Sequence, residues 1–361
     1  MEELLRAAPY AWDRATKAAV HAALFSDLTA HHYARCPGYR RILQASGVAP
    51  EAPFDRESLP FLPVRLFKDV DLRSVDAADV VKTMTSSGTT GGRVSRIAVD
   101  RETGALQTRA LARIMGSLLG SARLPMIVFD TAAVVGDPRS PAAQTFSARS
   151  AAVRGFSTFA RDRVFALDDD LTLDIARVEE FVERHRGERS FAFGFTYVLW
   201  QHVVFALSRA KRRLPLDGAV LVHGGGWKKM AERGVPSASF RAALRDTCGV
   251  TDVHDYYGMV EQTGAIHLEC EAGHLHASNF GDVVVRRAHD FRPAAPGERG
   301  LVEVISVLPR SYPGHALLTE DEGALLGEDD CRCGRRGRYF RVFGRLPHAE
   351  LRGCSDVHGA A

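Results

Sequence analysis

The sequence predicts an α/β protein with a β-rich distal part, and three observations lead to this fold class. Short apolar runs alternate with segments of helical periodicity from residue 79 to residue 257, as in proteins whose helices connect parallel strands. From Asp282 onward, strand-like runs follow one another without helical segments between them. Neither an internal repeat, a low-complexity segment nor a clear linker breaks the chain. We therefore expect one continuous large domain.

Each element follows from local periodicity. Apolar residues at helical spacing predict helices at 14–47, 101–119, 173–186, 196–209 and 237–247. Shorter apolar runs predict strands at 79–84, 97–100, 125–130, 190–195, 219–223 and 253–257, followed by 283–287, 300–306 and 338–343. Pro53, Pro60 and Pro63 predict a loop before the first of these strands, since proline lacks a backbone donor.

Composition excludes several classes of function. The 361 residues include 47 basic and 44 acidic ones, for a formal charge of +3, which gives no case for nucleic acid as a partner. The basic run Arg209–Arg213 is most simply a solvated helix end. The acidic N-terminus does not read as a signal peptide, and no stretch approaches the ~20 apolar residues of a membrane helix. Six cysteines in a chain of this length predict no disulfide scaffold, so we expect a soluble, cytoplasmic protein.

The segment from Thr85 to Arg96 is the most informative part of the chain. It reads Thr-Ser-Ser-Gly-Thr-Thr-Gly-Gly-Arg-Val-Ser-Arg and lies between two predicted strands. Glycines allow close approach of the backbone to an anion, and exposed N–H groups and hydroxyls can surround a polyphosphate. The Walker A pattern is absent, because Gly-Lys-Ser/Thr is missing. The alternative is a flexible hairpin loop; the phosphate-binding candidates are Ser86, Ser87, Gly88, Thr89, Thr90, Gly91 and Ser95.

Two further segments follow predicted strands. Tyr256–Glu261 reads Tyr-Tyr-Gly-Met-Val-Glu, which places a carboxylate at the carboxyl end of a strand, where α/β sites usually lie. A carboxylate there can hold a Mg²⁺ ion that bridges nucleotide phosphates, although such a motif alone usually indicates a turn. The second segment is His223 followed by Gly224, Gly225 and Gly226, a glycine run against which a flat base could lie.

The last quarter contains a metal-like pattern. Cys331 and Cys333 flank one residue, and Cys270 lies close in sequence to several histidines. Two such motifs can form a tetrahedral Zn²⁺ site. His276, His274 and His267 compete for the histidine position, and the alternative is a set of reduced thiols with surface histidines.

Together these motifs resemble the acyl-adenylate-forming superfamily. There the loop is Thr-Ser-Gly-Thr-Thr-Gly, and Tyr-Gly-x-Thr-Glu follows downstream, with Val260 here in place of the threonine. Thr319-Glu320-Asp321 is similar to the superfamily's Thr-Gly-Asp. His-Gly-Gly-Gly-Trp-Lys at 223–228 more narrowly resembles the acyl-protein synthetases of bacterial bioluminescence. Ser95, where many members have lysine, agrees with that resemblance.

The resemblance implies a fold and a set of roles. The fold is the superfamily's N-terminal domain, stacked α/β sheets plus a β-rich subdomain, over residues 1–343, with the zinc-bearing part at about 264–343. Residues 344–361 would be a truncated hinge and tail, with the C-terminal domain almost entirely absent. ATP and Mg²⁺ are the implied cofactors. The implied roles are magnesium binding by Glu261, ribose binding by Asp321, and nucleotide contacts by Tyr257, Gly258 and the segment His223–Gly226.

The resemblance also implies a metal site and raises the question of which residue compensates the charge of the transition state. The phenylacetate-CoA ligase branch implies structural zinc on Cys270, His276, Cys331 and Cys333. The lysine of the superfamily's C-terminal domain has no counterpart, because no lysine follows Lys229. An arginine is therefore expected to compensate charge, with Arg345 as the catalytic candidate and Arg341 as a nucleotide contact.

The sequence allows two kinds of acyl acceptor and one alternative function without catalysis. Arg352-Gly353-Cys354-Ser355 resembles the region in which luminescence acyl-protein synthetases carry an acylated cysteine, which would make Cys354 a nucleophile. Alternatively, coenzyme A or a carrier protein accepts the acyl group and Cys354 is incidental. A third reading is a non-catalytic, zinc-stabilised nucleotide-binding module. The substrate is expected to be a hydrophobic carboxylic acid, and the aromatic run from Phe191 to Trp200 is either core or part of its pocket.

Overall fold

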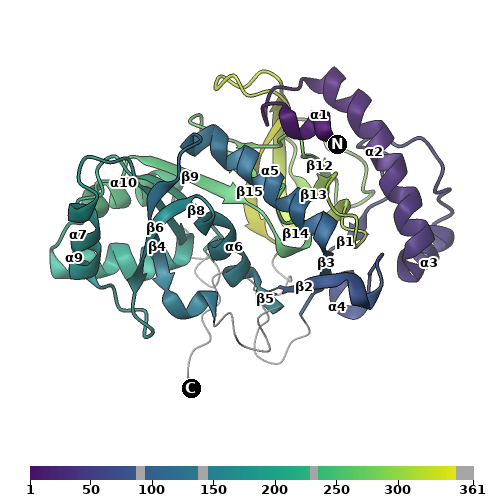
Figure 1. Ribbon diagram of the computed structural model, residues 1–361. Helices are drawn as coiled ribbons and strands as arrows, with labels where there is room; N and C mark the ends of the chain where they lie inside the picture. The colour runs from purple at the N-terminus through teal and green to yellow at the C-terminus, as the bar shows by residue number, and fades with distance from the viewer. Residues whose placement is uncertain (87–93, 137–144, 228–234, 347–361) are drawn as a thin grey trace. The chain divides into compact units, whose positions relative to one another are not determined.

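The computed structural model describes residues 1–86, 94–136, 145–227 and 235–346 (Figure 1). The chain divides into two compact units. The first combines Met1–Ser117 with the segment that begins at Gly258, and the second comprises Leu118–Tyr257. The predicted division of the sequence at residue 343 stays a prediction.

The second unit is built on a parallel sheet in the order β9-β8-β7-β4-β6. Its inner strands are buried, nearly continuous apolar runs, as expected where helices cover both faces. The strands are β4 (Leu124–Thr131), β6 (Ala160–Leu167), β7 (Phe191–Phe195), β8 (Val220–Gly224) and β9 (Asp252–Tyr257). The other elements are η2 (Ala132–Val135), β5 (Thr145–Ser147), α6 (Ala148–Ser157), α7 (Ile175–Arg184) and α10 (Ser237–Cys248).

The helix that follows β7 is interrupted by a π-helical turn. It runs as α8 (Thr196–Val198), the π-helix η3 (Leu199–Val204) and α9 (Phe205–Ala210), and it ends at Lys211 with φ of 51°. The predicted helix at 196–209 is therefore present, but its middle has the wider hydrogen-bonding pattern. π-helical turns are rare overall, and those that occur are often found at functional sites.

The first unit begins with helices. They are α1 (Glu2–Arg6), α2 (Arg14–Arg35), α3 (Pro37–Ala45), α4 (Leu66–Asp69), η1 (Ala77–Asp79) and α5 (Arg101–Leu119). The Asp13 side chain caps α2 by accepting a hydrogen bond from the Thr16 backbone. The helical region predicted at 14–47 is two helices because Pro37, which cannot continue a helix, begins the second.

The rest of the first unit is mostly antiparallel sheet, in the order β12-β13-β14-β15-β11-β10. The strands are β10 (His267–Glu269), β11 (Leu275–His276), β12 (Gly281–Arg286), β13 (Gly300–Ser306), β14 (Ala316–Glu328) and β15 (Arg338–Arg345). β1 (Leu62–Pro63) pairs in parallel with β14, and β2 (Val80–Thr85) forms a hairpin with β3 (Arg96–Asp100). The short turn η5 (Val260–Gln262) precedes β10. The predicted β-rich distal part is confirmed.

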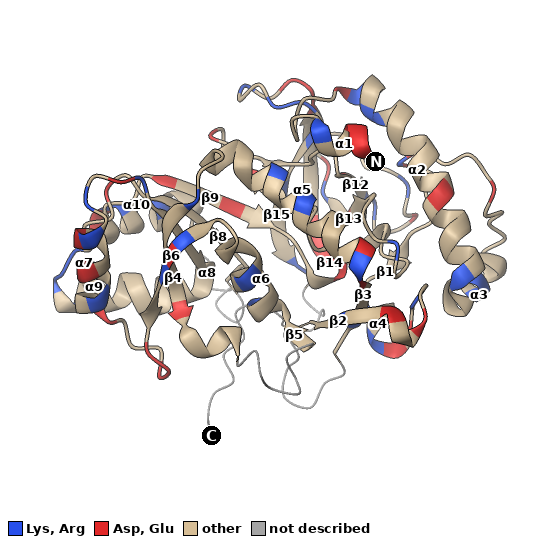
Figure 2. Cartoon of the chain, viewed as in Figure 1, with Lys and Arg blue, Asp and Glu red and all other residues tan. Residues whose placement is uncertain are grey.

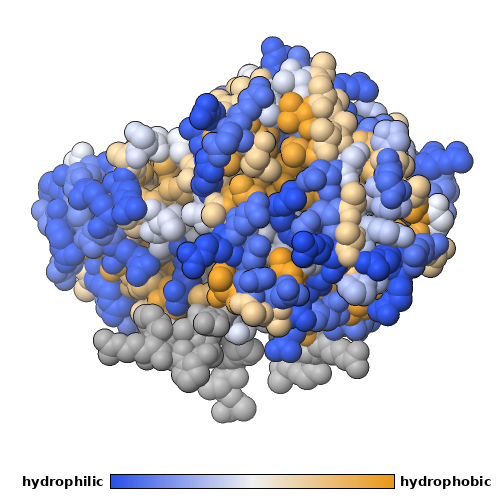
Figure 3. Space-filling view, turned by 45° about the vertical axis from the view of Figure 1, so that its right-hand side comes forward, coloured by the Kyte–Doolittle hydropathy of each residue, from blue (hydrophilic) through white to orange (hydrophobic). Residues whose placement is uncertain are grey.

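Charges of both signs are interspersed on the surface. Helix α7, for example, carries arginines and glutamates along ten residues, and Figure 2 shows the same mixture on other helices. Hydrophilic residues dominate the face in Figure 3. No helix in the described parts of the chain is long and apolar enough to cross a membrane.

Candidate functional site

The glycine-rich segment connects the paired strands β2 and β3, as the sequence predicts. Ser87, Gly88, Thr89, Thr90 and Gly91 lie outside the described residues. Both flanks of the loop are described, and they bond to each other. The Ser86 backbone N–H donates to the Ser95 carbonyl at 3.3 Å, and the Ser95 N–H donates to the Ser86 hydroxyl at 2.9 Å. The strands therefore fix both ends of the loop.

Glu261 is buried at the centre of the candidate site in the first unit. It lies in the turn η5 and is 5% exposed. Burial raises the pKa of this carboxyl, while the nearby Ser95 hydroxyl and, more weakly, the Arg345 guanidinium favour its charged form. A cation would stabilise the carboxylate further, because it would offset the desolvation. Ser95, Glu261 and Arg345, which come from distant segments of the chain, thus lie near one another in the first unit.

Asp321 lies within β14. Its backbone pairs with Arg345 of β15, and the Arg345 Nε atom lies 3.5 Å from the Asp321 Oδ1 atom. The Asp321 N–H donates to the Thr319 hydroxyl at 3.1 Å, and that hydroxyl donates to the Val302 carbonyl at 2.7 Å. A register shift follows directly, between Glu322 and Gly323. Such irregularities re-aim side chains at the edge of a site.

Arg341 lies on β15 opposite Ala324 and is exposed. Its charge lowers the pKa of His274, although burial is the larger cause of that shift. The described contacts thus relate Arg341 to the cysteine and histidine cluster rather than to Glu261. Its predicted nucleotide contact stays a prediction.

In the second unit, His223 occupies the carboxyl end of β8. Its Nδ1 atom lies 3.0 Å from the Thr196 hydroxyl and 3.6 Å from the Asp255 carboxylate. The Thr196 hydroxyl also lies 3.1 Å from the Gly224 carbonyl, to which it can donate. Burial lowers the pKa of His223 to about 3, so the imidazole is neutral. Thr196 was not singled out by sequence reasoning; its place directly after β7 was the available signal.

The glycine run after His223 meets two different structural needs. A Cβ atom on Gly224 would lie 2.6 Å from the Tyr256 ring, so only glycine fits there. Gly225 and Gly226 have φ values of 84° and 64°, which favour glycine. Tyr257 ends β9, and Gly258 begins the next segment of the chain.

An aromatic cluster lies beside His223 in the second unit. The ring of Trp227 is 5.7 Å from Trp200 and 5.5 Å from Phe240, and the His223 ring is 5.0 Å from Phe240. Trp200 comes from the π-helical turn. The aromatic residues predicted from Phe191 to Phe195 are themselves fully buried core. The cluster therefore extends that core toward the edge where β7 and β8 end.

The four predicted zinc ligands come together in the first unit. One donor atom from each of Cys270, His276, Cys331 and Cys333 lies within 4.8 Å of all the others. The His276 Nε2 atom is 3.4 Å from the Cys333 sulfur, and the sulfurs of Cys270 and Cys331 are 4.0 Å apart. Three thiols and one imidazole form a donor set that suits tetrahedral Zn²⁺.

The two competing histidines take different positions. His274 lies at the rim of the cluster, with its Nδ1 atom 3.3 Å from the Cys331 sulfur. His267 packs its ring 5.0 Å from Phe340 and is not one of the four.

The amino-terminal segment packs on this cluster. The Tyr10 ring lies 6.1 Å from the His276 ring, and the Arg335 guanidinium covers Tyr10 at 4.4 Å. The Arg336 N–H donates to the Tyr10 carbonyl at 3.0 Å, and the Asn279 N–H donates to the Pro9 carbonyl at 2.7 Å. Order at the cysteine and histidine cluster is therefore coupled to order at the N-terminus.

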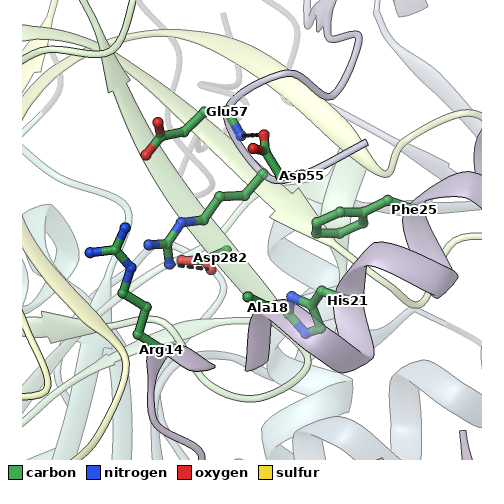
Figure 4. A pocket seen from close by; sticks show the side chains of 8 residues that line it. Arg14, Ala18, His21, Phe25, Asp55, Glu57 and Asp282 are labelled. Carbon is green, nitrogen blue, oxygen red and sulfur yellow. Dashed lines mark hydrogen bonds and ion pairs between the residues drawn. The ribbon is translucent and has the colours of Figure 1, made fainter. Parts of the chain in front are cut away.

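A separate cavity of about 140 Å³ lies in the first unit (Figure 4). Asp282 on its wall is 3.3 Å from Arg56 and 3.7 Å from the buried Lys17. Burial alone would raise the pKa of Asp282, but these two cations lower it. None of the predicted site residues lines this cavity, which is formed by Arg14, Ala18, His21, Phe25, Asp55, Arg56, Glu57 and Asp282. Its buried charges are paired with one another, which indicates a structural role.

Comparisons with known proteins agree on fold and family. Solved structures of a 2-hydroxyisobutyryl-CoA ligase share the fold: the open form with 2-HIB-AMP and CoA has a TM-score of 0.71 and 16% identity over 93% of this chain and 71% of that one. Curated relatives are a long-chain-fatty-acid–luciferin-component ligase of Vibrio harveyi, 22% identical over 96% of this chain and 89% of the relative, and one of Aliivibrio fischeri, 24% identical over 88% and 82%.

The sequence model described as "Acyl-protein synthetase, LuxE" matches residues 1–361, the full length given. The resemblance stated from the motifs is confirmed. This chain has the fold of the solved acyl-CoA ligase and belongs to the acyl-protein synthetase family, LuxE.

Proposed function

We propose that this chain uses ATP to activate a long-chain fatty acid as acyl-AMP and then transfers the acyl group to a thiol. The observation that carries the proposal is the grouping of Ser95, Glu261, Asp321 and Arg345 in the first unit. The substrate class is suggested by the two curated relatives, which are named long-chain-fatty-acid–luciferin-component ligases.

In the first half-reaction a carboxylate oxygen of the acid attacks the α-phosphorus of ATP. The bond from that phosphorus to the bridging oxygen breaks, and pyrophosphate leaves. We assign the β2–β3 loop and Ser95 to the phosphates, Asp321 to the ribose hydroxyls and Arg345 to the developing charge on the α-phosphate. The segment His223–Gly226 is assigned to the adenine base, and Tyr257 and Gly258 are assigned as further nucleotide contacts.

Glu261 is the assigned magnesium ligand. Bound Mg²⁺ would neutralise phosphate charge, which is its usual contribution to nucleotide chemistry. The residue fits this role because burial disfavours its carboxylate until a cation approaches. Of the other site groups, the Asp321 carboxylate lies 3.5 Å from the Arg345 guanidinium and is assigned to the ribose. The hydroxyls and the guanidinium bind phosphate oxygens rather than metal.

Zinc is assigned to the cluster of Cys270, His276, Cys331 and Cys333 on the basis of its donor set. All four positions of a tetrahedron would be filled by protein, so the ion would be structural. It would hold the hairpin β10–β11 against the segment between β14 and β15 and, through Tyr10, order the amino-terminal segment.

In the second half-reaction a thiolate attacks the acyl carbon and AMP leaves. Cys354 is the assigned nucleophile; it lies outside the described residues. The alternative acceptors are coenzyme A or a thiol of a carrier or partner protein. The cytoplasm is the expected location, because the reaction needs ATP and a reduced thiol.

The test uses radiolabelled fatty acid and ATP with the wild type, with Cys354→Ser and with Cys36→Ser as a matched control. Cys36 is buried and far in sequence from the tail. Wild type and control should carry label that hydroxylamine removes, and Cys354→Ser should form acyl-AMP without that label, since serine is a much weaker nucleophile. Wild-type protein that forms acyl-AMP but never carries label would exclude Cys354 and leave coenzyme A or a carrier protein as acceptor.

A further inference from the structure

The residue after the proposed magnesium ligand is a buried glutamine with unusually specific contacts. Gln262 is 3% exposed. Its side-chain Nε2 atom donates to the Val304 carbonyl at 2.9 Å and to the Gly314 carbonyl at 2.7 Å. An amide nitrogen has two donors, so both are used. Neither the amide nor the backbone carbonyls titrate, so these two hydrogen bonds do not depend on pH.

One carbonyl belongs to β13 and the other to the loop just before β14. Val304 lies on β13, and Gly314 precedes β14, the strand that contains Thr319 and Asp321. Gln262 therefore joins the turn of Glu261 to the scaffold of the proposed ribose contact. Removing the amide donor would leave two buried carbonyl groups without a hydrogen-bond partner, which costs folding free energy.

The loop at Gly314 also touches Glu261 directly. A Cβ atom on Gly314 would lie 2.9 Å from the Glu261 carbonyl oxygen and 2.2 Å from the Tyr312 ring. Only glycine allows this approach. Three residues after Glu261, Gly264 has a φ of 92° and lies so close to α5 that an added Cβ would be 2.6 Å from the Gln107 backbone. Close backbone contacts thus fix the turn that carries Glu261 at two points.

We propose that Gln262 is a positioning residue that holds the Glu261 carboxylate where it can bind the magnesium ion of MgATP. The proposal rests on the proposed function. It assigns no contact between Gln262 and substrate. Partners that orient a metal ligand typically affect metal affinity by about 10- to 100-fold.

The test measures ATP binding by calorimetry across a magnesium titration, so it needs no catalysis. Gln262→Leu keeps the size and removes both donors, and Gln262→Glu keeps the shape but places a charge against two carbonyls. Asn279→Leu is the matched control: Asn279 is also buried in the first unit, and its amide donates to the Ala8 carbonyl at 2.7 Å. Thermal melting of all variants gives the structural cost.

We expect Gln262→Leu to raise the half-saturating magnesium concentration about 10-fold or more, and Gln262→Glu at least as much. Asn279→Leu should lower the melting temperature without that shift. Equal magnesium dependence in wild type and Gln262→Leu, or the same shift in Asn279→Leu, would overturn the positioning role. Wild-type protein that binds ATP without any dependence on magnesium would instead overturn the proposed role of Glu261.

Discussion

The Nε atom of Arg345 lies 3.5 Å from the Oδ1 atom of Asp321, across the register pair that joins β15 to β14. The Asp321 side chain is 14% exposed and that of Arg345 is 34% exposed. Two residues proposed for the ribose and for the phosphate charge therefore hold each other before any nucleotide binds. Such an arrangement reduces the reorganisation needed on binding.

Asp321→Asn should weaken ATP binding about 10-fold or more, because a hydrogen bond to a charged group contributes ~1.5–3 kcal/mol. The neighbouring Glu322→Gln is the control, since the exposed pair between Glu322 and Arg299, at 3.7 Å, should contribute little. Calorimetric titration with ATP measures both. Equal affinities in the two variants would move the ribose contact to another residue.

Glu261→Gln should reduce acid-dependent pyrophosphate exchange by at least about 100-fold, the upper end of what loss of a contact that supports a bound metal costs. It should also raise the melting temperature without magnesium. Burial raises the pKa of Glu261 above its ordinary value of 4.5, so the folded state binds more protons than the unfolded state above that pH. Wild-type stability thus falls as pH rises through the raised pKa, and the penalty persists at neutral pH.

Melting curves at pH 4 and pH 7.5 check the sign of this effect. The stabilisation by Glu261→Gln should be present at pH 7.5 and shrink toward pH 4, where both states are protonated. A variant that is less stable than wild type at pH 7.5 would show that the carboxylate is held by favourable contacts rather than penalised by burial.

The fold was predictable where local periodicity decides it and less so where distant contacts do. Pro37 shows in the sequence why two helices replace the single region predicted at 14–47. The acidic run Glu320–Glu322 has a composition typical of a surface turn, yet it lies in β14 because the paired strands β13 and β15 hold both of its edges. Nothing local predicts the π-turn at Leu199–Val204.

The same division applies to the site. Cys-x-Cys and the nearby histidines made the metal cluster predictable, and the motif around Tyr257 pointed to Glu261. Gln262 carried no signal, because its partners Val304 and Gly314 are far away in the sequence. The contact of the buried Lys17 with Asp282 was hidden for the same reason.

Zinc should be present at about one atom per chain without being added, and Cys331→Ser should remove it. The variant should melt about 5 °C or more below wild type. For a domain of this size, each 1 kcal/mol lost from the free energy of unfolding lowers the melting temperature by roughly 2–4 °C. Proteases should then cut within residues 1–13, because Tyr10 packs on His276. Cys248→Ser, a buried thiol of the second unit, is the control. Elemental analysis that finds no zinc in wild type would contradict the assignment.

Two glycine-to-alanine changes should have opposite effects on stability. Gly224→Ala forces a methyl group against the Tyr256 ring, so it should destabilise the protein by about 1–3 kcal/mol. Gly116→Ala, in α5 with nothing within 4 Å of the added carbon, should stabilise it by roughly 0.5–1 kcal/mol. Denaturant unfolding measures both, and a neutral Gly224→Ala would mean that β8 and β9 can separate at their ends without cost.

Acid-dependent exchange of labelled pyrophosphate into ATP tests adenylation most directly. With magnesium present, wild-type protein should return label to ATP only when a fatty acid is supplied, and the rate should rise with chain length toward long-chain acids. Glu261→Gln should abolish the signal while Asn279→Leu retains it. Absence of exchange with every acid of a panel from acetate to stearate, by protein that melts cooperatively, would contradict catalysis of carboxylate adenylation by this chain.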